Sequence, residues 1–185
     1  ARIAEASGVN EDKRTVPIAA LTAPRMFTQR DPWVNILRAT TACFGAGVAG
    51  ADAITVLPFE SALGLPKDLG RRIARNIQSI LQEESGLNRV LDPAGGAWLF
   101  ENLTDRLSEA AWAFFQAIEK AGGMAKVLRS GGIAKAIEKV QGERAKNIAM
   151  RRDAITGVSE FPDVNEKSVE RSEEHTSELQ SRFGI

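Results

Sequence analysis

The glycine-rich segment Gly45–Gly50 is the part of this sequence whose residue types and spacing best match a known binding motif. Its sequence, GAGVAG, fits the GxGxxG pattern that binds dinucleotide phosphates when the pattern follows a strand and opens a helix. Here the order is reversed, because a helical pattern precedes the glycines and a strand-type run follows them. We therefore assign these small residues to close packing of a helix on a sheet, and a nucleotide-dependent oxidoreductase is only a third hypothesis.

The acidic, thiol and imidazole side chains form no complete catalytic set. Glu83 and Glu84 are adjacent at a predicted helix end, so they point in different directions and into solvent. Cys43 is the single cysteine, and the single histidine, His175, lies in a tail that is excluded below. An activated thiol needs a neighbouring base, and a structural zinc site needs several Cys or His ligands. The sequence therefore predicts no catalytic residue and no metal site of its own.

The composition of the 185 residues excludes several classes of protein. The 24 basic side chains balance 24 acidic ones, which argues against a nucleic-acid binder, because such proteins need a basic surplus. No apolar run reaches the roughly 20 residues that span a bilayer, and no signal-peptide pattern is present. A single cysteine excludes an intrachain disulfide and suits a reducing compartment. We therefore expect a cytoplasmic chain with no nucleic-acid and no membrane partner.

The C-terminal tail differs from the rest of the chain. Residues 166–185 are polar and have neither helical nor strand periodicity, which predicts a disordered terminus. Within this tail, Arg171–Ser181 reads RSEEHTSELQS, which is the translation of a common sequencing-library adapter. We interpret residues 171–185 as an assembly artefact and exclude them from the function. Because His175 falls in this segment, the natural part of the chain contains no histidine.

Two strand-type runs and four helical segments must position any functional residues. Val16–Leu21 and Ala53–Leu57 are short apolar runs of the kind found in buried parallel strands, and we expect them to lie side by side and parallel. Alternation of strands and helices is typical of α/β architecture, and two strands are too few to close a sheet, so we expect a piece of a larger domain. Helical periodicity predicts four helices, over residues 32–47, 67–85, 101–121 and 133–150.

The helical segments carry expectations about their ends and faces. Asp31 is expected to cap the first helix with Pro32 at its first position, and Gly86 is expected to end the second helix. The third helix should turn its apolar stripe inward, and the nearby aromatic side chains should belong to the core. The apolar stripes of the four helices are Trp33, Leu37, Phe44 and Val48; Leu69, Ile73, Ile77, Ile80 and Leu81; Leu103, Leu107, Ala111, Phe114 and Ile118; and Ile133, Ile137, Val140 and Ile148. The aromatic side chains assigned to the core are Trp98, Trp112, Phe114 and Phe115.

Several short motifs occur in the order and spacing found in the methylmalonyl-CoA mutase family. They are DPWVN at 31–35, ALGLP at 62–66, RIARN at 72–76, LQEES at 81–85, DPAGG at 92–96 and AGGM at 121–124. The chain resembles this family from about residue 1 to about residue 165. The resemblance implies an α/β fold in which residues 1–122 form the last βα units of a TIM (β/α)8 barrel. It also implies that residues 123–165 form a helical extension of that barrel.

The resemblance also implies which positions face the substrate. Catalytic members of the family interconvert methylmalonyl-CoA and succinyl-CoA with adenosylcobalamin, which a separate domain holds against the barrel. They carry a histidine and a glutamine where this sequence has Ala19 and Leu21. Asp52, Ala53 and Thr55 occupy further substrate-facing positions of the family, and Thr55 stands in place of a second histidine. Alanine and leucine cannot polarise a thioester, so the substrate site is degenerate.

The positions that face cobalamin in the family are degenerate as well. Ser61 replaces a glutamate of the catalytic chains, and only Ala62 is retained. These losses resemble the small, non-catalytic subunit of heterodimeric mutases, as does the segment Asp153–Pro162 near the end of the match. The resemblance then implies a large catalytic subunit as the partner and adenosylcobalamin at the level of the complex. This chain itself is expected to bind no cofactor and to be inactive alone.

Two hypotheses from the resemblance stay open. The leading one is a fragment of the small, non-catalytic subunit, which supports its catalytic partner. The alternative is a fragment of a catalytic cobalamin-dependent acyl-CoA mutase with altered acyl specificity, since Ala19 and Leu21 could reshape an acyl pocket. Thr55 and Ser61 count against the alternative, because their family positions abut the cofactor rather than the acyl group.

Overall fold

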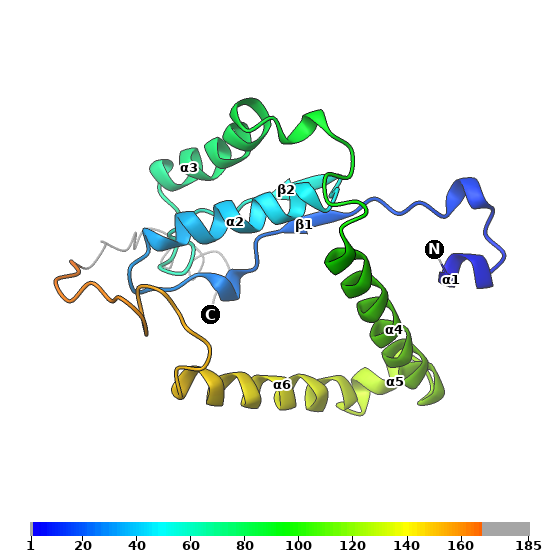
Figure 1. The fold of residues 1–185 in the computed structure, drawn as a ribbon. Coiled ribbons are helices and arrows are strands. Elements are labelled where there is room, and N and C mark those ends of the chain that lie inside the picture. The colour runs from blue at the N-terminus through cyan, green and yellow to red at the C-terminus, as the bar shows by residue number, and fades with distance from the viewer. Residues whose placement is uncertain (1, 168–185) are drawn as a thin grey trace, which may run out of the picture. The chain divides into compact units, whose positions relative to one another are not determined.

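The computed structural model in Figure 1 describes residues 2–167 of the chain. These residues form two compact units, Ala1–Pro93 together with the described residues from Asn165, and Ala94–Val164. The helices and strands of the first unit are α1 (Arg2–Ala6), β1 (Ala19–Leu21), α2 (Val34–Val48), β2 (Ala53–Thr55) and α3 (Asp68–Ser79). Those of the second unit are α4 (Trp98–Lys120), α5 (Met124–Arg129) and α6 (Gly132–Ala149). The segment interpreted as an assembly artefact lies outside the described residues.

The two predicted strands pair in parallel, which confirms the predicted neighbours and their direction. Ala19 lies opposite Ala53, and Leu21 lies opposite Thr55. Both strands are shorter than their apolar runs. Before β1, the Ile18 N–H donates at 2.7 Å to the Asp52 carboxylate rather than to a strand carbonyl.

Thr22 continues the hydrogen bonding between the two chain segments where the regular strand pairing ends. The backbone N–H of Thr22 donates to the Thr55 carbonyl at 3.1 Å, and its hydroxyl oxygen accepts the Leu57 N–H at 2.8 Å. The Thr22 side chain therefore replaces a backbone carbonyl in the ladder. Pro58, which has no N–H, follows at once, so the second run cannot continue as a strand.

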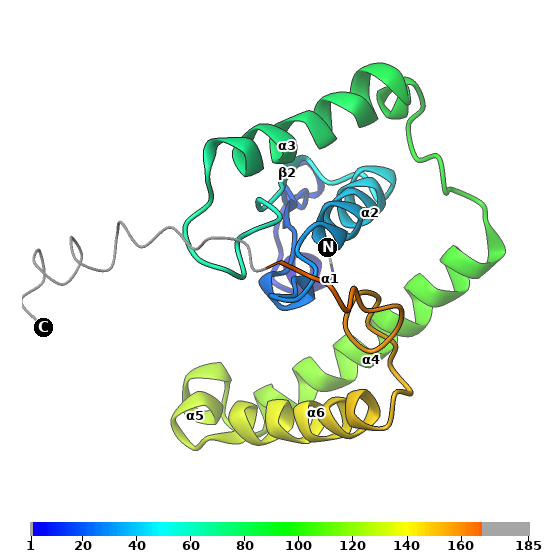
Figure 2. The same ribbon diagram turned by 90° about the vertical axis from the view of Figure 1, so that its left-hand side faces the viewer.

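Helix α2 packs on β2 and α3 through a row of small or polar side chains (Figures 1 and 2). The buried residues of α2 are Asn35, Ala39 and Cys43, spaced four apart. The larger apolar side chains are on the outside, and Leu37 is 67% exposed. Small residues let the helix approach its neighbours closely, so the face of α2 that is buried is not the one with the large apolar residues.

The start of α2 corrects the capping prediction. The helix begins at Val34, so Asp31 is not its N-cap and Pro32 is not its first residue. Asp31 instead has a φ of +44°, and its carbonyl accepts the Val34 N–H at 3.1 Å in a tight turn. The Asp31 N–H donates to the carboxylate of Glu166 at 2.7 Å, so the first residue of the predicted disordered tail contacts this turn.

Helix α3 ends differently from a regular α-helix. Its buried residues are Gly70, Ala74 and Ile77, and the chain then continues into a π-helical turn, Ile80–Glu84. In that turn the Ser85 N–H donates to the Ile80 carbonyl, five residues back, at 2.9 Å. Gly86 follows with a φ of +61°, which confirms that this glycine ends the helical segment. Two residues of the predicted stripe, Leu69 and Ile80, are exposed.

The second unit corrects the prediction of an inward stripe on α4. Leu103, Leu107 and Phe114 are exposed, and only Ile118 of that stripe is buried. Within this unit α4 meets α5, and α5 packs on α6 (Figure 2), so little of the described chain covers the length of α4. Trp98 is 91% exposed, so it is not a core residue either.

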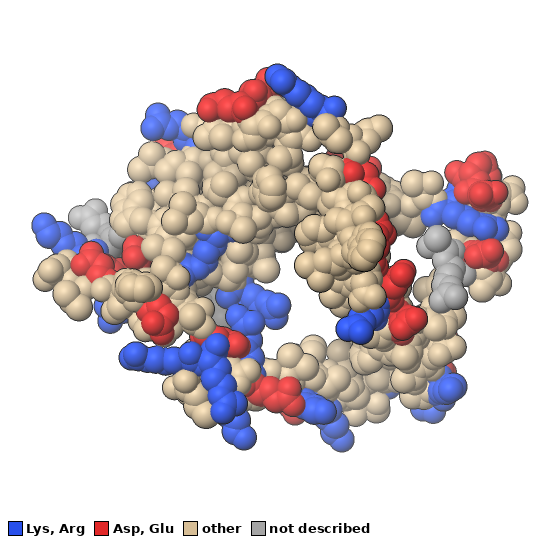
Figure 3. All heavy atoms as spheres, in the orientation of Figure 1, with Lys and Arg blue, Asp and Glu red and all other residues tan. Residues whose placement is uncertain are grey.

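Other residues of the second unit are partly covered. Trp112 and Phe115 stack with ring centroids 5.4 Å apart, and both are half-buried. On α6, Ile137 and Val140 are exposed. Lys and Arg side chains lie along α6 in Figure 3. In the part of the chain that the structure describes, no helix is long and apolar enough to cross a membrane.

Candidate functional site

The predicted substrate-facing residues gather on one face of the β1–β2 sheet. Ala19, Leu21, Ala53 and Thr55 are all exposed, and the strand register places them in two adjacent pairs. Because successive side chains of a strand point to opposite faces, these four share the face opposite Ile54. Ile54 itself packs against the buried core of the first unit. The structure thus brings four of the seven predicted positions together.

The chemistry that this face offers is limited. Ala19 and Ala53 present methyl groups and Leu21 presents an isobutyl group, none of which can donate or accept a hydrogen bond. Only the hydroxyl of Thr55 could donate to the carbonyl oxygen of a thioester. Stabilising the charge that develops on such an oxygen takes oriented donors in the site, and one exposed hydroxyl is a weak substitute.

The other three predicted positions lie apart from this face. The carboxylate of Asp52, at the beginning of β2, accepts the Ile18 N–H. The hydroxyl of Ser61, beyond the other end of β2, donates to the Pro58 carbonyl at 2.6 Å. Ala62 packs its methyl group against the core. The polar groups of Asp52 and Ser61 are therefore engaged in holding the backbone.

The most buried polar residue of the described chain is Asn35, which the sequence reasoning did not assign to any role. Asn35 has no exposed surface, and its amide nitrogen donates to the carbonyls of Thr28 and Phe59, each at 2.9 Å. Its amide oxygen accepts the Thr28 N–H at 3.0 Å and an Arg38 guanidinium N–H at 2.7 Å. One side chain therefore joins α2 to the loops that follow both strands. The signal was present, because Asn35 is the last residue of the DPWVN motif.

Arg38 completes this network from the next turn of α2. Its guanidinium also donates to the hydroxyl oxygen of Thr28 at 3.0 Å. Burial lowers the pKa of Arg38, and the carboxylate of Asp31 acts in the opposite direction. Arginine stays charged at neutral pH in spite of such a shift, so Arg38 is a fixed cation that orients Asn35.

A second polar contact joins the loop after β2 to the start of α3. Glu60 is buried, and its carboxylate accepts the Lys67 N–H. A side chain at Gly70 would place its Cβ 2.7 Å from the Glu60 carboxyl carbon, so the carboxylate sits directly over the first turn of α3. The partial positive charge of a helix N-terminus favours a carboxylate in this place. Glu60 is thus engaged in starting the helix.

The polar groups around the strand ends are complete as they stand. Among residues 2–167, no buried side-chain nitrogen or oxygen lacks a hydrogen-bond partner. Within the same residues, no group of three His, Cys, Asp or Glu side chains is arranged to hold a metal ion. The arrangement is that of a scaffold, in which charged groups fix loops and a largely apolar face lies beside them.

The comparison with known families decides the identity of this scaffold. The sequence profile of the family described as methylmalonyl-CoA mutase matches residues 1–182. The chain belongs to the methylmalonyl-CoA mutase family. Within that family, it is similar to the methylmalonyl-CoA mutase small subunit of Streptomyces virginiae, with 56% identity over 177 residues. This alignment covers 92% of the chain and 28% of that relative.

Other members of the methylmalonyl-CoA mutase family give a consistent picture. The small subunit of Propionibacterium freudenreichii subsp. shermanii is 49% identical over 171 residues, which cover 92% of the chain and 27% of that protein. The methylmalonyl-CoA mutase of Escherichia coli (strain K12) is 39% identical over 135 residues, covering 73% of the chain and 19% of that protein. The chain therefore spans less than a third of the length of these relatives. The predicted resemblance to the small subunits is confirmed.

Proposed function

We propose that this chain is part of a non-catalytic small subunit of methylmalonyl-CoA mutase, which supports a catalytic partner. The observation that carries the proposal is the exposed face formed by Ala19, Leu21, Ala53 and Thr55. These are the positions that would meet the acyl-CoA in a catalytic chain, and together they offer one hydroxyl. On this proposal the face is a substrate site that has lost its polar groups.

We further propose that the first unit is a piece of a TIM barrel. Three features support this: β1 and β2 are parallel and adjacent, a helix connects them, and the helices pack on one face only. The exposed face would then be the barrel interior, which further strands would close. Residues 1–122 would belong to the barrel and residues 123–165 to the helical extension.

Adenosylcobalamin is the cofactor that the family implies, and it would supply the radical chemistry of the isomerisation when bound. The residues present do not fit it. The hydroxyl of Ser61 is already bonded to the Pro58 carbonyl, and Ala62 presents a methyl group to the core. No buried side-chain nitrogen or oxygen in the described residues lacks a hydrogen-bond partner. We derive no step through cobalamin at this chain and place the cofactor on the catalytic partner.

The partner that we propose is a large, catalytic mutase subunit, in a heterodimer. The supporting observation is that relatives with 49–56% identity to the chain are named small subunit. These names favour this proposal over a catalytic chain with altered acyl specificity. In the heterodimer, the Asn35 and Glu60 networks would keep this chain rigid while the partner carries the chemistry.

The proposal can be tested with a chimera. Residues 1–170 replace the matching segment of the Streptomyces virginiae small subunit, and the chimera is produced alone or with the large mutase subunit of that organism. We expect succinyl-CoA formation and a cob(II)alamin absorbance only in the pair. Turnover by the chimera alone would contradict the proposal.

A single substitution separates the proposal from the alternative. In the active pair, Leu21→Ala should leave kcat, KM and the preference among acyl-CoA substrates unchanged, because Leu21 is not in the reacting pocket. A changed acyl preference would identify Leu21 as part of a working substrate site. The unaltered Streptomyces virginiae pair is the control for both measurements.

A further inference from the structure

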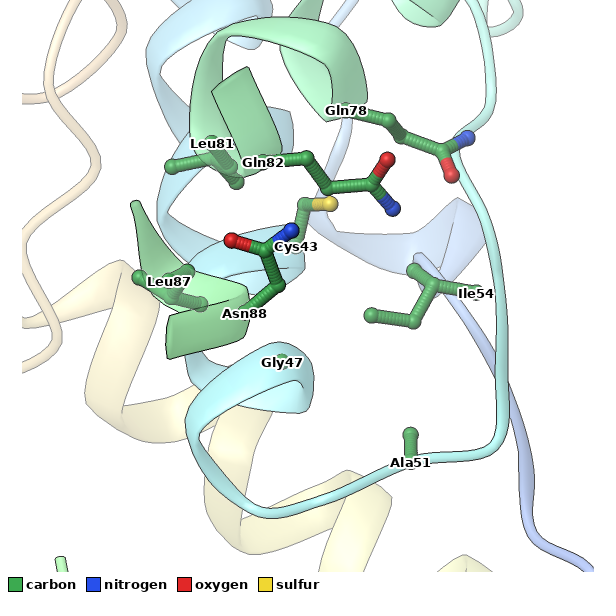
Figure 4. Close-up of a pocket in the computed structure, with 9 residues that line it drawn as sticks. All are labelled: Cys43, Gly47, Ala51, Ile54, Gln78, Leu81, Gln82, Leu87 and Asn88. Carbon is green, nitrogen blue, oxygen red and sulfur yellow. The ribbon is translucent and has the colours of Figure 1, made fainter. Parts of the chain in front are cut away.

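A cavity of about 200 Å³ lies in the first unit, beside the beginning of β2 (Figure 4). Ala51 lines it two residues before the strand starts, whereas Ser61 and Ala62 follow the other end of β2. The cavity is therefore at the opposite end of the sheet from the family's cofactor positions. The residues that line it are Cys43, Gly47, Ala51, Ile54, Gln78, Leu81, Gln82, Leu87 and Asn88.

The inner part of the cavity is apolar and uncharged. Cys43, which is 3% exposed, and Leu81 are buried, and Ile54 packs against the same core. No Asp, Glu, Lys, Arg or His is among the lining residues. An ion entering this space would lose its hydration without gaining an opposite charge, which is strongly unfavourable. The lining therefore selects against both anions and cations.

Three amide side chains supply the polar part of the lining. Gln78, Gln82 and Asn88 surround the cavity in Figure 4. Gln82 and Asn88 are exposed and Gln78 is half-buried, so solvent can reach these amides, and none of them is hydrogen-bonded to another residue within the described chain. Each amide offers one acceptor oxygen and two donor hydrogens. A ligand that both donates and accepts, as a primary amide does, matches this set.

The walls of the cavity depend on unusual backbone conformations. The π-helical turn Ile80–Glu84 carries Leu81 and Gln82, and such turns are rare and are frequently found at functional sites. Gly86, in the left-handed region, turns the chain so that Leu87 and Asn88 line the same space. These features shape the cavity from two sides.

A glycine of the GAGVAG segment completes the wall. At Gly47 a Cβ atom would lie 2.8 Å from Cδ2 of Leu87, closer than real Cβ contacts allow. A side chain at this second glycine of the motif would therefore force Leu87 to shift away from α2. This contact gives the motif a role unconnected with phosphate binding.

We propose that this cavity is a binding site for a neutral small molecule with an apolar body the size of one ring and an amide-like hydrogen-bonding end. An apolar cavity of about 150 Å³ in another protein accommodates benzene, so the volume here suits a ring with one small substituent. The uncharged lining and the three amide groups select the chemistry. The inference does not depend on the proposed function, because the cavity lies on the Ile54 face of β2, opposite Ala53 and Thr55, and at the other end of the sheet from Ser61 and Ala62.

The test uses benzamide as the probe and benzoate as a charged molecule of nearly the same shape. Cys43 is the only cysteine of the chain and lines the cavity, so the rate of its reaction with methyl methanethiosulfonate, a small uncharged thiol reagent, reports on access to this cavity. Benzamide should slow that reaction about tenfold at ten times the dissociation constant measured by ligand-observed NMR. Benzoate at the same concentration should have no effect. Equal protection by both, or protection by neither, would overturn the proposal.

Variants of the chain locate the binding. Gln82→Leu removes an amide of the lining and should weaken benzamide binding about tenfold, the effect of one or two lost hydrogen bonds. Ala51→Leu should fill the cavity and abolish binding. Gln116→Leu, on α4 and outside the lining, is the matched control and should bind as the unaltered chain does.

Two measurements keep the test decisive if a variant does not fold. Circular dichroism and the rate of Cys43 reaction without benzamide show whether each variant is folded. The comparison of benzamide with benzoate needs no variant at all. Binding that survives both Gln82→Leu and Ala51→Leu in folded protein would place the benzamide site elsewhere and overturn the proposal.

Discussion

The two ends of the β1–β2 sheet treat their polar side chains in opposite ways. At the carboxyl end, Asn35 and Glu60 are buried, and their hydrogen bonds join α2, the loops and α3. At the amino end, the amides of Gln78 and Gln82 line a cavity and have no partner among the described residues. The comparison indicates that the first end maintains the fold, whereas the second keeps polar groups available for a ligand.

The difference should appear in the cost of substitution. Removing a buried, fully bonded group leaves its former partners unsatisfied, and each such partner costs about 1–3 kcal/mol. Removing an amide that bonds only to solvent leaves nothing unsatisfied. Each prediction below compares the free energy of unfolding, measured by urea titration with circular dichroism, between the chain and one variant.

Asn35→Ala should have the largest effect. It leaves the carbonyl of Phe59 and the backbone groups of Thr28 without partners in a buried place, so we expect a loss of about 3–5 kcal/mol. Asn76→Ala, on the exposed side of α3, is the control and should change stability by less than about 0.5 kcal/mol. Similar losses in both variants would show that the Asn35 network does not hold this end together.

Gly70→Ala should be the next most damaging. Alanine is the better helix former, yet its Cβ would lie 2.7 Å from the Glu60 carboxyl carbon, so we expect a loss of about 2 kcal/mol. Gly142→Ala on α6 meets nothing within 4 Å and should instead raise stability by about 0.5–1 kcal/mol. The double variant Glu60→Ala, Gly70→Ala should lose less unfolding free energy than the sum of the two single losses. Strictly additive losses would contradict the contact between residue 70 and the Glu60 carboxylate.

The third effect depends on pH and concerns the cavity end. Burial raises the pKa of the Cys43 thiol above its ordinary value. In the unfolded chain the Cys43 thiol ionises at about pH 8.5. Above this pH the unfolded state therefore loses the thiol proton, whereas the folded state retains it. The Cys43 contribution to stability is therefore complete below that pH and decreases as the pH rises through the folded pKa.

Cys43→Ala is the variant that isolates this contribution. It should remove the decrease in stability above about pH 8.5, while the carboxylate-dependent behaviour at low pH is unchanged. An identical alkaline slope in both proteins would show that the thiol is accessible to water.

Gln82→Leu should have the smallest effect on stability. Because the Gln82 amide has no partner in the described chain, we expect the free energy of unfolding without ligand to change by less than about 0.5 kcal/mol. A loss above about 1 kcal/mol would mean that this amide maintains the fold, which would remove the contrast between the two ends.

The sequence alone was sufficient to predict β1, β2, α2 and α3 of the first unit, but neither α1 nor the faces that the helices bury. Strand-type runs correctly predicted β1 and β2 as parallel neighbours, and the 3.6-residue period located α2 and α3. Periodicity cannot say which side of a helix is covered, however. On α2 the small row of Ala39 and Cys43 is buried, because it permits a close approach, while Leu37 remains exposed.

The candidate site was likewise predictable only in part. Parallel pairing, once predicted, puts Leu21 beside Thr55, so the exposed face could be anticipated from the sequence. The role of Asn35 could not, because its partners come from loops whose paths no local pattern specifies. The π-helical turn was equally hidden, since residues 67–85 read as one continuous helix and a single inserted residue leaves no periodic trace.

The pairing of β1 with β2 has a consequence for the order of events during synthesis. Ile18 and Asp52, which bond at the beginning of the sheet, are 34 residues apart, and only α2 and its flanking turns lie between them. Both strands and their connecting helix therefore emerge from the ribosome before α3 does, and N-terminal parts of a chain can fold during synthesis. Glu60 must then remain without these partners until Lys67 and the first turn of α3 emerge to meet it.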